Sequence, residues 1–216
     1  MNMKRIRNKV ILSFFCGLLV CSLSGCFALV AGGVAETALL LGDRSPVSVV
    51  TIDRGLQIQI DSMLLQNFPE NAHVNVNVYN QKVLLTGEVT TQKLKDQVQS
   101  NVAAIKNIRT VVNEIQVGPL SSMSARLSDS SLFTLVKAKL IATTDVPSNS
   151  MKIIVEAGSV YLMGITTELE AKASATVTSK SSNSIQQVVK LFDIITEDEK
   201  QKLINGAANE KAPTVR

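Results

Sequence analysis

Few residues in this sequence have side chains suited to covalent or metal chemistry. The cysteines Cys16, Cys21 and Cys26 all lie near the N-terminus, and His73 is the single histidine. An activated nucleophile needs a neighbouring base, and a zinc site needs several nitrogen, sulfur or carboxylate ligands, and neither motif is visible in this set. Glu168 and Glu170 are interpreted as acids at the start of a helix. We therefore expect no catalytic residues, no metal site and no cofactor, and a protein that is not an enzyme.

Cys26 is the cysteine whose surroundings indicate a reaction. Four basic residues precede an apolar run over 10–23, which is short for a ~30 Å hydrocarbon core and is typical of an export signal. The run ends in Leu23-Ser24-Gly25-Cys26, which resembles the lipobox of bacterial lipoproteins. The resemblance implies cleavage before Cys26 and acylation of its sulfur, and Phe27 in place of aspartate implies the outer membrane. The alternative is an ordinary signal peptide with an incidental cysteine.

The net charge argues against a nucleic-acid partner. The chain has 22 basic and 18 acidic residues, and four of the basic residues lie in the leader, which has no acids. The chain from Cys26 onward is therefore formally neutral, whereas nucleic-acid-binding proteins normally carry a marked basic excess.

An internal duplication defines the organisation of the remaining chain. An offset of 77 residues aligns Val83 with Val160 and Gly87 with Gly164, and an offset of 76 aligns Asp53 with Asp129 further upstream. Each repeat shows helical spacing of apolar residues, then strict strand alternation, as in 74–78. The order is helix, strand, strand, helix, strand, with Asp53 and Asp129 as candidate helix caps. The predicted fold is α+β, in which two helices of each repeat cover one face of a three-stranded sheet.

The expected boundaries follow from these patterns. They are a signal peptide at 1–25, a lipidated tether at 26–51, domain 1 at 52–118, a linker at 119–127, domain 2 at 128–195 and a mobile C-terminal tail at 196–216.

The second strands contain Val83-Leu85-Gly87 and Val160-Leu162-Gly164. Together with the duplicated element order and the lipobox, they resemble the dual BON-domain lipoprotein family of the Gram-negative outer membrane. The resemblance implies two tandem BON domains facing the periplasm. It also implies recognition of anionic phospholipids such as phosphatidylglycerol and cardiolipin by the second domain. A role in outer-membrane integrity, with links to cell division and to the outer-membrane protein assembly machinery, is implied as well.

Comparison of the repeats gives candidate lipid-contact residues. The first helix of repeat two differs from its counterpart at four flanking positions, which carry Phe133, Leu135, Lys137 and Lys139. Apolar and basic side chains on one helix suit an anionic membrane interface. The competing interpretation is that the apolar pair widens the core and the lysines are only solvated. Protein contacts, if the chain is instead a scaffold, are expected on repeat one, where the matching positions include Gln57 and Gln59.

Two glycines and the histidine are given structural interpretations and no functional role. Gly87 and Gly164 are interpreted as structural glycines inside strands, and His73 as a surface or loop residue.

Overall fold

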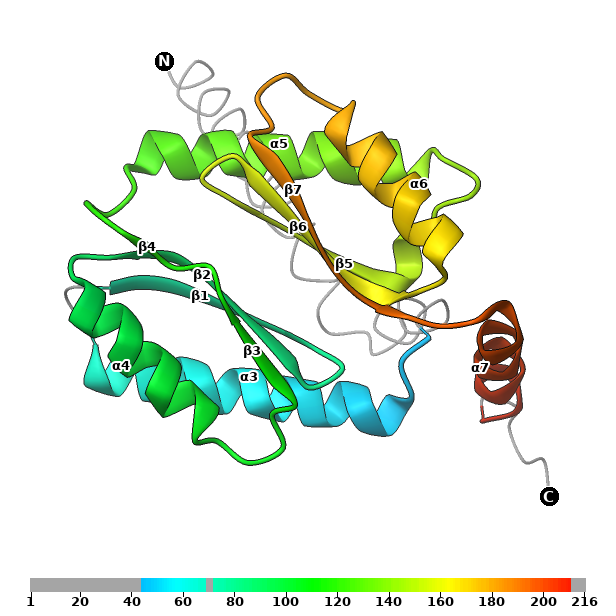
Figure 1. Ribbon diagram of the computed structural model, residues 1–216, viewed down its shortest axis with the longest axis horizontal. Helices are drawn as coiled ribbons and strands as arrows, with labels where there is room; N and C mark the ends of the chain where they lie inside the picture. The colour runs from blue at the N-terminus through cyan, green and yellow to red at the C-terminus, as the bar shows by residue number, and fades with distance from the viewer. Residues whose placement is uncertain (1–43, 69–71, 211–216) are drawn as a thin grey trace, which may run out of the picture. The chain divides into compact units, whose positions relative to one another are not determined.

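The computed structural model describes residues 44–68 and 72–210, so the predicted signal peptide and Cys26 lie outside the described residues. Domain 1 contains α3 (Val47–Asn67), β1 (Ala72–Tyr79), β2 (Lys82–Val89), α4 (Gln92–Ala103), β3 (Thr110–Asn113) and β4 (Gln116–Val117). Domain 2 contains α5 (Met123–Ile141), the 3-10 turn η1 (Ser148–Ser150), β5 (Met151–Glu156), β6 (Ser159–Thr166), α6 (Glu168–Ser179) and β7 (Gln187–Ile194). A last helix, α7 (Glu197–Glu210), follows. The predicted α+β fold and element order are confirmed in both repeats (Figure 1).

Each domain is built around a central strand. β2 pairs with β1 in antiparallel orientation and with β3 and β4 in parallel orientation, and β6 pairs likewise with β5 and β7. A parallel neighbour requires a crossover connection, which α4 and α6 supply. In each domain both helices lie on the same face of the sheet (Figure 1). The predicted third strand of domain 1 is interrupted at residues 114–115 and forms two short strands, β3 and β4.

The two sheets also bury apolar side chains on the faces opposite the helices. Tyr79 and Leu84 of domain 1 belong to one buried cluster with Tyr161 and Met163 of domain 2. Leu84 and Met163 are fully buried. Burial on both faces explains why β2 and β6 are largely apolar without strict alternation. The domains therefore share a third core in addition to their own helix-covered cores.

The prediction that Asp53 and Asp129 cap helices is wrong. α3 begins at Val47 and α5 at Met123, so both aspartates lie inside helices. The Asp53 carboxylate accepts hydrogen bonds from the backbone N–H groups of Asn80 and Gln81, at 2.6 and 2.8 Å. Asp129 accepts from Ala157 and Gly158, both at 2.9 Å. Each aspartate fastens its helix to the turn of the following hairpin, where the backbone has positive φ.

The chain that follows β7 also differs from expectation. The sequence predicts a mobile tail over 196–216, yet α7 occupies Glu197–Glu210. Thr196 and Glu199 bond reciprocally as a capping box, and Leu203 packs against the shared core. The helix therefore has both a cap and a packing partner. None of the described helices is long and apolar enough to cross a membrane.

Candidate functional site

Helix α5 carries all four predicted lipid-contact residues. Its side-chain cap is Ser122, and it packs on the sheet of domain 2 through Leu132, Val136 and Leu140, which are buried. These three residues recur every four positions and form the inward stripe of the helix. The remaining face of α5 is available for contacts outside the domain.

The four predicted residues lie on the two sides of this stripe. Phe133 is half-buried, and the exposed Lys137 places its Nζ 5.5 Å from the centre of the Phe133 ring. Leu135 is 40% exposed and Lys139 is exposed in the last helical turn. At 100° per residue the Phe133–Lys137 side and the Leu135–Lys139 side are separated by roughly 200° across the exposed face of the helix. The structure thus brings Phe133 and Lys137 together, but it does not bring them together with Leu135 and Lys139.

Three apolar residues missed by sequence reasoning lie between these sides. Met123, Leu127 and Ile141 are 71%, 62% and 60% exposed. At 100° per residue they fall within roughly 40° of one another, on the outward face of α5. The sequence prediction starts the helix after Leu127 and so assigns Met123 and Leu127 to a linker. The sequence signal for them is the four-residue spacing of Met123 and Leu127, which extends the helical pattern toward the N-terminus.

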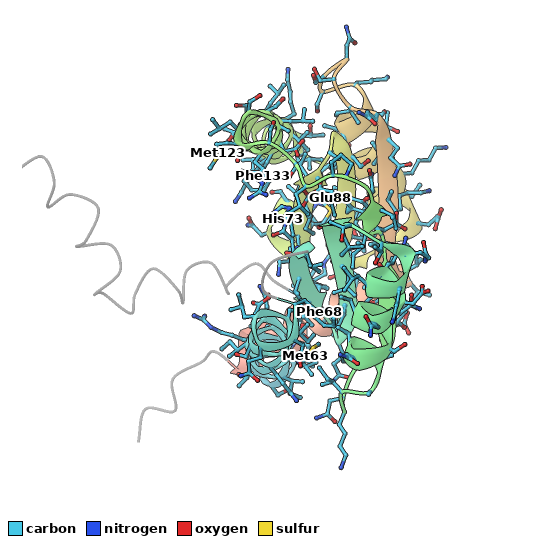
Figure 2. The ribbon with its side chains drawn as sticks, turned by 90° about the vertical axis from the view of Figure 1, so that its left-hand side faces the viewer. Met63, Phe68, His73, Glu88, Met123 and Phe133 are labelled. Atoms are coloured by element: carbon cyan, nitrogen blue, oxygen red, sulfur yellow. The ribbon has the colours of Figure 1, made fainter. Side chains whose placement is uncertain are left out.

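A groove of about 700 Å³ runs beside Phe133. Its walls come from α5 and β5 of domain 2 and from α3 and β1 of domain 1. The lining includes Phe133, Arg126, His73 and Glu156. In Figure 2, Phe133 extends from α5 on the side of the molecule where His73 is labelled. Phe133, which is half-buried, therefore faces the groove and not the outward surface.

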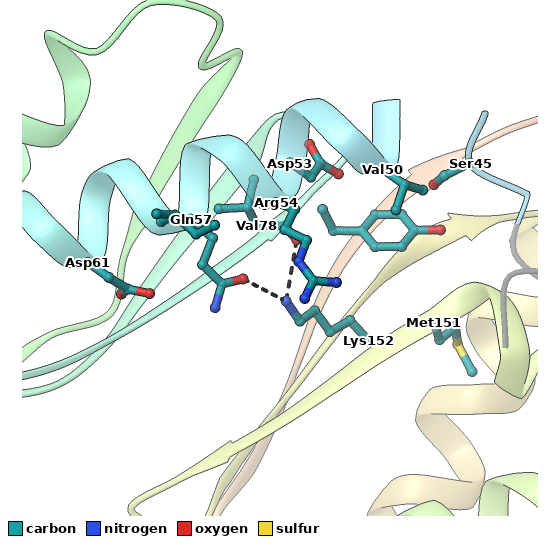
Figure 3. Close-up of a pocket in the computed structure, with 11 residues that line it drawn as sticks. Ser45, Val50, Asp53, Arg54, Gln57, Asp61, Val78, Met151 and Lys152 are labelled. Carbon is teal, nitrogen blue, oxygen red and sulfur yellow. Dashed lines mark hydrogen bonds between the residues drawn. The ribbon is translucent and has the colours of Figure 1, made fainter. Parts of the chain in front are cut away.

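A second pocket of about 590 Å³ lies between α3 and β5 and is lined in part by Lys152 (Figure 3). The Lys152 ammonium donates to the Gln57 side chain and to the Val78 carbonyl, each at 3.4 Å. Burial lowers the pKa of Lys152, and the charges of Asp53 and Asp61 act in the opposite direction. Burial likewise raises the pKa of Asp61, while Lys152 opposes it. Gln57, proposed above for partner contacts, thus contacts domain 2.

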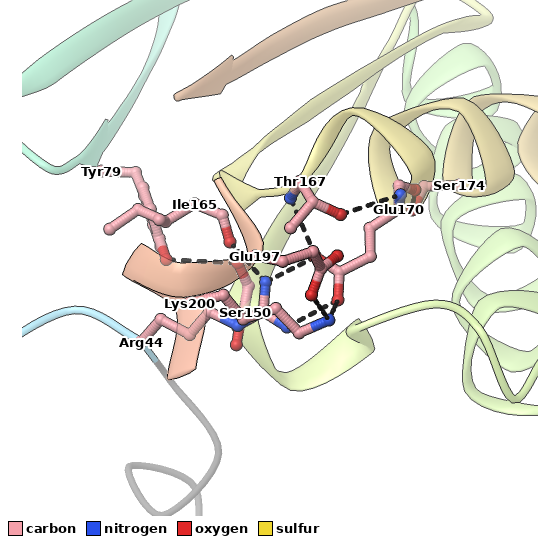
Figure 4. A network of polar contacts seen from close by, with 9 residues as sticks. All are labelled: Arg44, Tyr79, Ser150, Ile165, Thr167, Glu170, Ser174, Glu197 and Lys200. Atoms are coloured by element: carbon pink, nitrogen blue, oxygen red, sulfur yellow. Dashed lines mark hydrogen bonds and ion pairs between the residues drawn. The ribbon is translucent and has the colours of Figure 1, made fainter. Parts of the chain in front are cut away.

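An ionic network joins the segment before α3 to α6 and α7 (Figure 4). Arg44 donates to both Glu170 carboxylate oxygens, at 2.6 and 2.8 Å, and Lys200 approaches Glu170 at 3.0 Å. Burial alone would raise the pKa of Glu170, but hydrogen bonds from Arg44, the Thr167 backbone and Lys200 lower it from 4.5 to about 2. Glu170 is therefore a charged structural anchor.

The structure shows why glycine is required at Gly87 and Gly164 inside the strands. Gly87 has φ +104°, and a Cβ there would lie 1.9 Å from the His73 carbonyl oxygen. A Cβ at Gly164 would lie 2.5 Å from the Ser150 carbonyl oxygen. The close neighbour is the first strand in domain 1 and the residue just before the first strand in domain 2, and neither leaves room for a side chain.

The fold and its duplicated sequence match a known domain. The model of the BON domain family matches residues 53–119 and 128–196. The chain belongs to the BON domain family and carries two copies of the domain in tandem.

Comparison with individual proteins narrows this class to the dual BON-domain lipoproteins. The outer membrane lipoprotein DolP of Haemophilus influenzae is 32% identical over 172 residues, covering 79% of this chain and 89% of the relative. The 21 kDa hemolysin of Actinobacillus pleuropneumoniae is 30% identical over 126 residues, 58% of this chain and 64% of its own length. A solved structure of CdsD, a structural protein of the type III secretion system of Chlamydia trachomatis, is 14% identical. It covers 72% of this chain and 98% of its own, and its TM-score of 0.28 supports no conclusion.

Proposed function

We propose that this protein is a non-catalytic outer-membrane lipoprotein, anchored through Cys26 and facing the periplasm, that binds anionic phospholipid through α5. The proposed ligands are phosphatidylglycerol and cardiolipin, and the proposed role is to support outer-membrane integrity, including at division sites. The localisation is supported by similarity to the outer membrane lipoprotein DolP. The lipid function is carried by one observation, the combination of exposed apolar and basic side chains on α5.

The charge of α5 distinguishes it from the equivalent helix of domain 1. α3 also exposes apolar residues, among them Ile58 and Leu65 at 60% and 75%. Its sequence, however, contains two acidic residues and one basic residue, whereas α5 contains three basic residues and one acidic residue. The single acid of α5, Asp129, is already bonded to the hairpin turn. Each basic residue near an anionic surface contributes about 1 kcal/mol, so α5 is the helix favoured for lipid contact.

The exposed face of α5 indicates which of its residues would contact lipid. Met123, Leu127 and Ile141 form the centre of the exposed face, with Lys137 beside them. Phe133 supports Lys137 through its ring, and Leu135 with Lys139 forms the opposite border. The apolar centre would enter the headgroup boundary while the lysines remain at the phosphate level.

The test is vesicle co-sedimentation of the compact body, residues 43–216, which excludes Cys26 and thus any acyl anchor. Neutral phosphatidylcholine vesicles are compared with vesicles containing phosphatidylglycerol or cardiolipin across a salt series. We expect selective binding to anionic vesicles that weakens with salt, because exposed charges are screened. The double variant Phe133→Glu with Lys137→Glu and the single variant Leu127→Glu should each reduce binding at least tenfold.

Leu65→Glu on α3 is the matched control, because Leu65 aligns with Ile141 between repeats and is likewise exposed. It should leave vesicle binding unchanged, and Ile141→Glu should not. Equal binding by all variants, or no preference for anionic vesicles at any salt, would refute lipid recognition by α5.

A second proposal is a scaffold that contacts the outer-membrane protein assembly machinery through domain 1. Ile58 and Leu65, which are exposed on one face of α3, support it together with the exposed Gln59 on the neighbouring face. Cross-linking in membranes that is lost with Leu65→Glu but retained with Leu127→Glu would favour the scaffold over the lipid-binding module.

A further inference from the structure

The single histidine lies beside two glutamates that the sequence separates widely. His73 on β1 and Glu88 on β2 are cross-strand partners, and His73 Nδ1 lies 3.1 Å from Glu88 Oε2. Glu156 at the end of β5 comes from the other domain. One potential ligand atom of each residue lies within 4.8 Å of the other two. Figure 2 shows His73 and Glu88 adjacent on their neighbouring strands.

The charges of this cluster are poorly compensated. Glu88 is 7% exposed and Glu156 is 8% exposed. Within residues 44–68 and 72–210, neither carboxylate forms an ion pair with a lysine or an arginine. Burying a carboxylate is costly unless an opposite charge accompanies it. Two buried carboxylates from different domains thus lie close together, with one imidazole as their neighbour.

The hydrogen bonds that do form involve only one oxygen of each carboxylate. Glu88 Oε2 accepts from the Ser121 backbone N–H at 3.2 Å, in addition to its contact with His73. Glu156 Oε2 accepts from Asn75 at 2.6 Å and from Thr86 at 3.3 Å. In the described part of the chain, Oε1 of each glutamate has no hydrogen bond. Each carboxylate thus retains an oxygen that could bind a ligand.

We propose that His73, Glu88 and Glu156 bind a zinc-class divalent cation that links the two domains. One imidazole nitrogen and two carboxylate oxygens form a donor set that suits Zn²⁺ and related first-row ions. In a tetrahedral zinc site, ligand atoms about 2.0–2.1 Å from the metal lie roughly 3.3 Å from one another. His73 Nδ1 lies 3.1 Å from Glu88 Oε2, and one ligand atom of each of the three residues lies within 4.8 Å of the others, so small side-chain rotations would bring the three groups to this spacing.

The groove supplies access to this site. His73 and Glu156 both line the groove beside Phe133, so a cation and a water ligand could reach them from solvent. The other charged residues of the groove are Arg126, Asp129 and Asp61. Arg126 donates to the Ser121 hydroxyl, and Asp129 is bonded to the hairpin turn. No metal site is predicted from the sequence, because His73, Glu88 and Glu156 are far apart along the chain and meet only through the packing of the two domains.

The test uses the mature full-length protein in detergent, purified without a histidine tag and stripped with a chelator. Calorimetric titration with Zn²⁺ should show one equivalent bound, and bound Co²⁺ should show the visible absorption of a low-symmetry site. Mg²⁺ and Ca²⁺ prefer all-oxygen ligand sets and should bind at least tenfold more weakly. Zinc should also raise the Tm of the protein, because it binds only where both domains are folded together.

His73→Asn and Glu156→Gln should each reduce zinc affinity at least tenfold and abolish the cobalt spectrum. Glu168→Gln, which alters an exposed carboxylate, is the control and should leave both unchanged. Circular dichroism of the metal-free variants verifies that they are folded. Zinc binding that persists in both variants, or its absence from the unaltered protein, would overturn the proposal. These readouts need no vesicles, so they are independent of the lipid-binding proposal.

Discussion

At the scale of single residues, Glu170 links three parts of the chain through one carboxylate. Its pKa of about 2, against 4.5 ordinarily, means that the folded state binds the proton less tightly than the unfolded state. The stabilisation is therefore complete above about pH 4.5 and is lost as the pH falls toward 2. We predict that Glu170→Gln lowers the free energy of unfolding at pH 7 by about 1.5–3 kcal/mol, the range for hydrogen bonds to charged groups.

Urea unfolding between pH 7 and pH 2 checks this prediction. The unaltered protein should lose more stability across this window than Glu170→Gln does, because the variant has no carboxylate to protonate. Glu168→Gln, two residues earlier on the same helix and exposed, should follow the unaltered protein at every pH. Superimposable curves for the two variants would show that the network contributes nothing.

Gly87 gives a second prediction at this scale. Gly87→Ala should destabilise domain 1 by at least about 2 kcal/mol, because alanine disfavours φ +104° and its Cβ would meet the His73 carbonyl. Gly55 lies inside α3, and a Cβ added there would meet nothing within 4 Å, so Gly55→Ala should instead stabilise by up to about 1 kcal/mol. Thermal unfolding of the two variants should move Tm in opposite directions, and a common direction would contradict this account.

At the scale of elements, the repeated aspartate fixes a helix to a hairpin. Asp129→Ser should cost about 2–4 kcal/mol, because the Ala157 and Gly158 N–H groups lose a two-oxygen acceptor. If Asp129 were a helix cap, serine would replace it with little loss. Ser122→Ala, which removes the actual side-chain cap of α5, should cost about 1 kcal/mol. Chemical unfolding of both variants separates these roles, and a smaller loss for Asp129→Ser would restore the capping interpretation.

Asp53 and Asp129 also show which features can be predicted from local sequence patterns and which cannot. Periodicity and duplication predict the order of helices and strands, because amphipathic spacing is a property of consecutive residues. The predicted helix start is wrong because an aspartate before an apolar stripe has the same local signature whether it caps a helix or bonds to a distant turn. The capping box Thr196–Glu199 is visible in the sequence, and it explains α7 better than the assumption of a mobile tail.

The candidate surface was predictable only in part. Comparing the repeats identifies Phe133, Leu135, Lys137 and Lys139 because they depart from the paired helix. It cannot show that these residues lie on two sides of α5, or that Met123 and Leu127 belong to the same helix. His73, Glu88 and Glu156 converge through packing of one sheet on the other, and no local spacing encodes that contact.

At the scale of the whole molecule, the shared core determines whether the two domains unfold together. Leu84 is fully buried against domain 2, so it should couple the stability of both domains. We predict that the body over residues 43–216 unfolds in one cooperative transition, and that Leu84→Asp divides it into two. The introduced carboxylate cannot remain buried without a partner, so the sheets should separate at a cost of roughly 3 kcal/mol or more. Tyr161 and Met163 would then be uncovered, and domain 2 should melt earlier although its own sequence is unchanged.

Differential scanning calorimetry tests this coupling through the ratio of calorimetric to van't Hoff enthalpy. The control is Leu65→Asp, the same substitution at a leucine that is 75% exposed on α3, and it should preserve the single transition. Two transitions already present in the unaltered protein, with the domain 2 transition unmoved by Leu84→Asp, would mean that the domains are independent. A single transition that divides only in Leu84→Asp would mean that the two BON domains act as one folding unit, in which a ligand that stabilises either domain stabilises the other.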